Sequence, residues 1–163
     1  MKTALLATAA ILTLAVSASA QTPPSSAPHD PAVVFPTADL HDQIEKLVPA
    51  AKEKGSSGAT IEDYGSYKIQ LSVRTSSGGA EVHAHWDDVM IVEKGSATLI
   101  TGGTVADSKT NAEGETHGSK IENGDSRTIK EGDVLTVRAG TPHQLILAPG
   151  TTYGAVVVKI HEP

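Results

Sequence analysis

The stretch HAHWDDVMIVEKG, residues 83–95, decides both the expected fold and the expected site. Its two histidines, His83 and His85, stand two residues apart, so in an extended chain both side chains point to the same face. A second stretch, GDVLTVRAGTPH at residues 132–143, places a third histidine, His143, just after a Gly/Pro turn. Imidazole is a common ligand of transition metals, so the two stretches together predict a metal site.

The bulk composition describes an acidic chain without cysteine. The 163 residues include 13 basic and 19 acidic side chains, and this length favours one domain. A negative net charge makes binding to nucleic acid or to an anionic membrane unexpected. Because the sequence has no cysteine, stability has to come from packing of a Val-, Ile-, Leu- and Ala-rich core rather than from disulfides.

The N-terminus has the three parts of a secretory signal peptide. Lys2 is followed by an apolar run over residues 4–16, too short to span a bilayer, and then by the small residues Ala18-Ser19-Ala20. We therefore expect residues 1–20 to be a signal peptide cleaved after Ala20, and the mature protein to be secreted or periplasmic. A buried N-terminal helix is the alternative. Residues 21–31, rich in Pro and Ser, are expected to be a flexible leader.

One helix is expected, over residues 37–54, within an N-terminal helical segment at residues 32–57. Thr37 is a candidate cap, Pro49 predicts a break or a kink, and the Gly-Ser-Ser-Gly run at residues 55–58 ends the segment. Four apolar side chains recur at helical spacing, namely Leu40, Ile44, Leu47 and Val48.

From residue 58 to 163 the sequence predicts a β-barrel domain of about nine or ten short strands. We expect residues 89–92 and 97–100 to form a hairpin around Lys94-Gly95, and residues 120–121 and 127–129 to flank a hairpin turn at Asn123-Gly124. Residues 102–115 are polar and Gly-rich, and are expected to be a long loop that leaves the barrel.

The two stretches resemble the two sequence motifs of the cupin superfamily. The first family motif has Gly, five residues, His-x-His, three or four residues, Glu, six residues and Gly; here His83-x-His85 is present, and Asp88 precedes Gly95 by the right spacing. The second runs Gly-Asp, Pro-x-Gly, two residues and His, and Gly132-Asp133, Gly140 and His143 match it. Asp88 follows His85 after only two residues, Arg138 stands where the family has Pro, and Leu147 where it has Asn.

The resemblance implies an all-β jelly-roll barrel, a double-stranded β-helix, holding one divalent metal. Its ligands would be His83, His85 and His143, while Asp88 is either a ligand, an acceptor acting through water, or a solvated turn residue. Iron, manganese, nickel and zinc all suit imidazole and carboxylate donors. The resemblance also makes a homodimer plausible.

Two functions remain open at this point. The first is a metal-dependent enzyme acting on a small molecule, of dioxygenase, isomerase or lyase type. The second is a non-catalytic module that binds a sugar or an organic acid, and a storage protein is a weaker third. Trp86 lines a pocket mouth or packs at the rim or in the core. His117, in the segment 102–118, is solvated unless that loop forms a lid.

Overall fold

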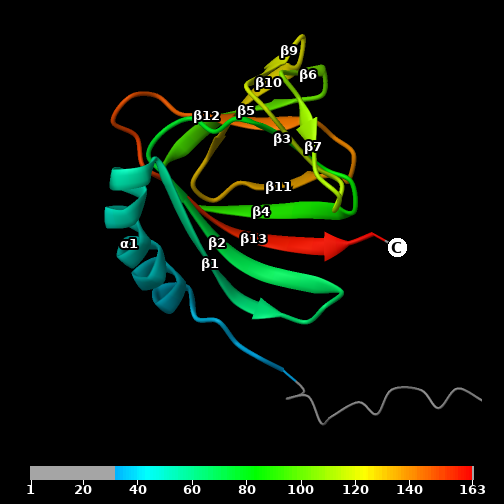
Figure 1. The fold of residues 1–163 in the computed structure, drawn as a ribbon. Coiled ribbons are helices and arrows are strands. Elements are labelled where there is room, and N and C mark those ends of the chain that lie inside the picture. Colours follow the sequence, from blue (N-terminus) through cyan, green and yellow to red (C-terminus); the bar gives the residue numbers. More distant parts are fainter. Residues whose placement is uncertain (1–31, 163) are drawn as a thin grey trace, which may run out of the picture. The chain divides into compact units, whose positions relative to one another are not determined.

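The computed structural model describes residues 32–162, so the expected signal peptide at residues 1–20 and leader at residues 21–31 lie outside the described part. Figure 1 shows two facing sheets with a helix against the outer side of one of them. The helix is α1 (Thr37–Lys54). The strands are β1 (Ser56–Asp63), β2 (Tyr67–Arg74), β3 (Ala80–His83), β4 (Trp86–Lys94), β5 (Ser96–Thr101), β6 (Thr104–Ala106), β7 (Lys109–Thr110), β8 (Glu115–Gly118), β9 (Lys120–Glu122), β10 (Asp125–Lys130), β11 (Val134–Val137), β12 (His143–Ile146) and β13 (Tyr153–His161).

The strand order is that of a jelly roll. The five-stranded sheet has the order β1-β2-β13-β4-β11, and the six-stranded sheet has the order β10-β5-β12-β3-β8-β7. Eight strands make up the core of the barrel. The chain alternates between the two sheets over β2 to β5, and it alternates between them again over β10 to β13, which pair with the first set. This double wrapping of antiparallel strands is the double-stranded β-helix, so the expected fold class is confirmed.

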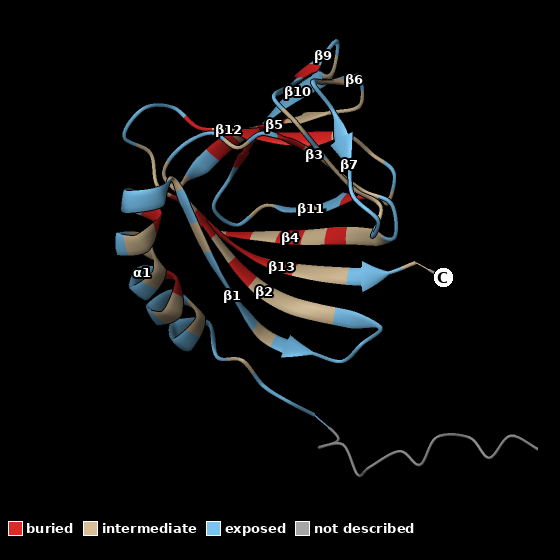
Figure 2. Cartoon of the chain, viewed as in Figure 1, coloured by how far each residue is buried: buried red, intermediate tan, exposed pale blue. Residues whose placement is uncertain are grey.

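The space between the sheets holds the main core. Alternate side chains of each strand face inward, and Met90, Val92, Leu99, Leu145 and others form one buried cluster. Figure 2 shows buried residues along β4, β12 and β13. Because these strands belong to the two opposing sheets, their inward side chains form the core between the sheets.

The helix α1 covers the outer face of the five-stranded sheet (Figure 1). Ile44 and Ala51, which are buried, pack in a second cluster with Leu71 and Val73 of β2. The expected bounds, residues 37–54, are confirmed. The helix continues through Pro49 to Gly55, whose left-handed φ of 87° ends it, so a break at Pro49 is wrong.

Three details of the expected helix and hairpins are wrong. Thr37 does not cap the helix, because Pro36 occupies the cap position and no side-chain cap hydrogen bond forms. The segments around Lys94-Gly95 are β4 and β5, which lie in opposite sheets and do not pair. At Asn123-Gly124 the flanking strands β9 and β10 also have other partners, β6 and β5. Both turns carry the chain from one sheet to another.

The polar segment at residues 102–115 is not one long loop outside the barrel. It contains β6 and β7, and the strand β8 that follows pairs with β3. Together β7 and β8 extend the six-stranded sheet beyond β3. This extension brings Glu115, the first residue of β8, opposite His83.

Candidate metal centre

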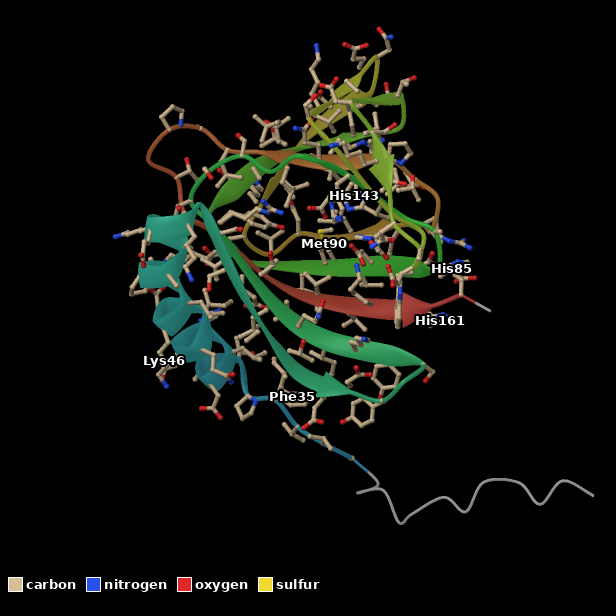
Figure 3. All side chains as sticks on the ribbon, in the orientation of Figure 1. Phe35, Lys46, His85, Met90, His143 and His161 are labelled. Atoms are coloured by element: carbon tan, nitrogen blue, oxygen red, sulfur yellow. The ribbon has the colours of Figure 1, made fainter. Side chains whose placement is uncertain are left out.

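Four polar side chains converge between the two sheets. Glu81 and His83 stand two residues apart on β3 and therefore share a face. His143, the first residue of β12, pairs directly with Glu81 across the sheet. Asp88 comes from β4 in the opposing sheet. Figure 3 shows His143 and Met90 in the space between the sheets.

The spacing of the donor atoms suits one metal ion. The ligand atoms of Glu81, His83 and His143 all lie within 4.8 Å of one another. Each histidine Nε2 is 4.0 Å from Glu81 Oε2, and Asp88 Oδ2 is 3.4 Å from Nε2 of His83 and 3.9 Å from Nε2 of His143. Donors about 2.0–2.2 Å from a shared ion are separated by about 3–4 Å, so the residues fit a divalent transition metal.

In each histidine of the cluster, Nδ1, the ring nitrogen that faces away from the cluster, has a hydrogen-bond partner, as is usual in metal-binding histidines. Nδ1 of His83 contacts the Glu115 carboxylate, and Nδ1 of His143 lies 3.1 Å from the Thr141 carbonyl oxygen. Both partners accept a hydrogen bond, so each Nδ1 carries the proton and donates it. Each Nε2 is then left with its lone pair directed at the cluster, which is the tautomer a metal needs.

Burial and neighbouring charges shift the pKa values within the cluster. Burial lowers the pKa of His143. For His83, burial acts in the same direction, but hydrogen bonds to Asp88 and Glu115 outweigh it and the pKa is raised. Burial opposes ionisation of Asp88, yet contacts with His83 and Lys159 hold its pKa below the usual value. In the metal-free cluster, His83 is therefore the histidine that takes a proton.

Lys159 occupies the other side of Asp88. Its Nζ donates to Asp88 Oδ1 at 2.6 Å, and Asp88 is 3 % exposed. The register explains the contact, since Lys159 on β13 pairs with Asp88 on β4. Asp88 therefore has one oxygen engaged by an ammonium group and the other directed at the two histidines.

The structure brings together three of the four residues predicted from sequence. His83, Asp88 and His143 meet, whereas His85 does not. The strand β3 ends at His83, so His85 lies on a bend, is exposed, and stacks on His161 with ring centroids 6.3 Å apart. Figure 3 shows both histidines away from His143.

Glu81 occupies the position expected for a histidine, and sequence reasoning missed it. The spacing carried the signal. Four residues separate His83 from Asp88, and the first motif has three or four residues between the second member of its metal-binding pair and its acidic residue. The pair is therefore Glu81-x-His83. Glu115 was missed as well, because it lies in a segment that the sequence predicted to be a loop.

A cavity of about 440 Å³ opens beside the cluster, a size in the range of small-molecule sites. Glu81, His83, Asp88 and His143 line one part of it, and the inner face of β1 and β2 lines another. Trp86 is not among the lining residues; it packs edge-on against His161 with centroids 4.8 Å apart. His117 is exposed on β8. Within residues 32–162, no helix has the length and hydropathy needed to cross a bilayer.

Known proteins resemble this chain in structure but not in sequence. No family model and no curated protein sequence matches it. Similar solved structures include a Klebsiella pneumoniae protein with a double-stranded beta-helix domain (16% identity, TM-score 0.49, 65% of this chain and 76% of that chain). Two others are the Cnp3 cupin domain of Schizosaccharomyces pombe (8%, 0.49, 66% and 65%) and the polyketide cyclase RemF of Streptomyces resistomycificus (17%, 0.47, 68% and 69%). At such values the likeness does not assign a function.

Proposed function

We propose that this protein is a metal-binding barrel of the cupin type that holds one divalent transition metal and acts on a small molecule. Glu81, His83 and His143 would hold the metal, with Asp88 as a fourth donor. The observation that carries the proposal is the paired support of both histidines at Nδ1, by Glu115 and by the Thr141 carbonyl. This support leaves Nε2 of each histidine facing Glu81, Asp88 and the other histidine. A histidine buried only for packing would not need that orientation.

A metal held by two imidazoles and one or two carboxylates keeps positions for water or a ligand. When bound, it would make a water molecule more acidic and stabilise negative charge on a coordinated oxygen. The protein supplies the rest: Lys159 holds Asp88 ionised, and the cavity beside the cluster admits the small molecule. Dioxygenase, isomerase and lyase chemistry all fit this arrangement, as does iron, manganese, nickel or zinc.

Elemental analysis of the purified protein tests the metal. We expect about one transition metal per chain in the wild type and its loss in His143→Ala, whose side chain is 6 % exposed. The matched control is His161→Ala, an exposed histidine outside the cluster. Equal metal content in the His143→Ala and wild-type proteins, or no metal after reconstitution with each candidate ion, would contradict the proposal.

The Lys159–Asp88 contact supports a second candidate, a metal-free binding module for a sugar or an organic acid. The ammonium group already compensates one carboxylate of the cluster, so the cluster does not need a metal for charge balance. This candidate predicts saturable ligand binding by metal-free protein and no turnover. Turnover that depends on an added metal would exclude it.

Export and dimerisation are proposals that rest on the sequence. We propose that the mature chain begins at Gln21 and is secreted or periplasmic. N-terminal sequencing of the protein recovered from outside the cytoplasm tests this. A homodimer would show as twice the chain mass in light scattering.

A further inference from the structure

Two cavity-lining side chains outside the cluster form a pair of their own. Arg74 on β2 and Tyr153 on β13 stand directly opposite each other in the register of the two strands. Directly opposite residues on neighbouring strands point to the same face. Both line the same cavity as Glu81, His83 and His143.

The Tyr153 hydroxyl is a buried donor without an acceptor. The residue is 0% exposed, and within residues 32–162 its hydroxyl oxygen is the one buried side-chain polar atom with no hydrogen-bond partner. Buried polar groups are almost always paired, because leaving one unpaired is costly. Burial raises the pKa of Tyr153 to about 12, so the hydroxyl keeps its proton and remains a donor at neutral pH.

Arg74 also has unused donors. Its one ion pair among the described residues is a contact of 3.4 Å between Nη2 and Glu81 Oε1, whereas a guanidinium offers several N–H groups in a planar fork. The side chain is 20% exposed. The absence of a side chain at Gly78 leaves space for the guanidinium, because a Cβ at that position would lie 2.6 Å from Nη1 of Arg74.

The charges around the cavity favour a single negative charge on the ligand. Glu81, Asp88 and Glu115 are the carboxylates of the cluster, and Arg74 and Lys159 are the cations that contact them. With both histidines neutral, a divalent metal would leave an excess of one positive charge. In a partly dehydrated cavity, an excess charge attracts a counter-ion more strongly than it does in bulk water.

We propose that Arg74 and Tyr153 form a subsite for the carboxylate group of a small organic acid. This inference deepens the proposed function, on which its charge argument rests, by naming the substrate class. It favours an organic acid over a neutral sugar, because a carboxylate accepts hydrogen bonds from both donors and neutralises the excess charge. Three further polar residues of β1 and β2, namely Thr60, Gln70 and Ser72, also line the cavity.

Glycolate and glycolamide test the subsite, because they have the same number of heavy atoms and differ in charge. We would titrate each into zinc-loaded protein and follow the amide and arginine side-chain signals by NMR. We expect glycolate to bind about tenfold or more tightly than glycolamide, the ratio for one charge-assisted hydrogen bond. In Tyr153→Phe and Arg74→Gln, glycolate binding should weaken by a similar factor.

Matched controls separate this subsite from general effects. Tyr67→Phe and Arg127→Gln make the same chemical changes at exposed positions and should leave glycolate binding unchanged. Tyr153→Phe should melt at the same temperature as the wild type or higher, because it removes an unpaired buried hydroxyl. Equal binding of glycolate by Tyr153→Phe and wild type, or equal binding of glycolate and glycolamide, would overturn the inference.

Metal content, measured on the same samples, keeps the two proposals apart. A protein that binds zinc but does not prefer glycolate refutes the carboxylate subsite alone. A protein that binds no metal but loses glycolate binding in Tyr153→Phe refutes the metal centre alone and supports the subsite.

Discussion

Replacing Lys159 with methionine tests how the cluster is balanced without a metal. The change removes the ammonium group that contacts Asp88 at 2.6 Å and keeps a side chain of similar length. Asp88 is then left with His83 as its remaining charged partner. We therefore expect the metal-free variant to be less stable than the wild type, because a buried carboxylate loses most of its compensation.

The size of the effect follows from burial. Removing one partner of a buried pair costs about 3–5 kcal/mol. Here the Lys159 side chain is 17% exposed and the Asp88 side chain 4%, and His83 remains as a partner, so we expect the loss to be about 2 kcal/mol. For a domain of this size that loss lowers the melting temperature by roughly 8 °C.

The same substitution should have the opposite effect on the metal. Lys159 repels a cation at the cluster, and a bound metal would compensate Asp88 in its place. By linkage, if metal recovers about 1.4 kcal/mol of the lost stability, the metal binds about tenfold more tightly in the variant. Chemical denaturation with and without zinc measures both quantities.

The control for this experiment is Lys120→Met, which removes a surface ion pair with Glu122 and should leave stability unchanged. Two results would contradict this role of Lys159. One is a metal-free Lys159→Met protein as stable as the wild type, which would mean that the contact with Asp88 contributes nothing. The other is weaker metal binding in the variant, which would mean that Lys159 supports the metal instead of competing with it.

Two further predictions concern pH and the helix. The raised pKa of His83 means that a proton competes with the metal for this side chain. The metal affinity, measured by titration at several pH values, should therefore fall about tenfold per pH unit below the pKa of His83 in the folded protein and stay level above it. In metal-free protein the same shift stabilises the fold below pH about 6.5, and this contribution is lost as pH rises through the folded pKa. Ile44→Ala, at a residue of α1 that is 1% exposed, should lower the free energy of unfolding in urea by about 2–4 kcal/mol. Val34→Ala, at an exposed position, should change it little. Retained stability in Ile44→Ala would mean that α1 is not docked as described.

Local sequence patterns predicted the strands and the helix well because each depends on neighbouring residues. Alternation identified most strands, and the spacing of Leu40, Ile44, Leu47 and Val48 indicated the helix. Alternation does not tell which sheet a strand joins. The turn at Lys94-Gly95 has the composition of a hairpin turn, yet the strands on either side of it join opposite sheets. Met90 of β4 and Leu99 of β5 both belong to the core cluster between those sheets. Strand pairing in a jelly roll is set by contacts distant in sequence, and no local signal carries it.

For the site, too, local patterns identified some residues, and distant contacts decided the others. The spacing of the two motifs led to His83, Asp88 and His143, but the end of β3 at His83 decides which neighbour turns inward. On that strand the inward pair is Glu81 and His83, and His85 falls on the bend beyond it. Glu115 and Tyr153 come from strands whose places in the sheets were not predictable from alternation.

Metal affinity in Glu81→Gln and His85→Gln, measured side by side, distinguishes the two possible ligand pairs. We expect Glu81→Gln to weaken metal binding about tenfold or more, since an amide oxygen replaces an ionised donor, and His85→Gln to leave it unchanged. Loss of metal in His85→Gln with retention in Glu81→Gln would mean that the pair is His83-x-His85 and that Glu81 is not a ligand.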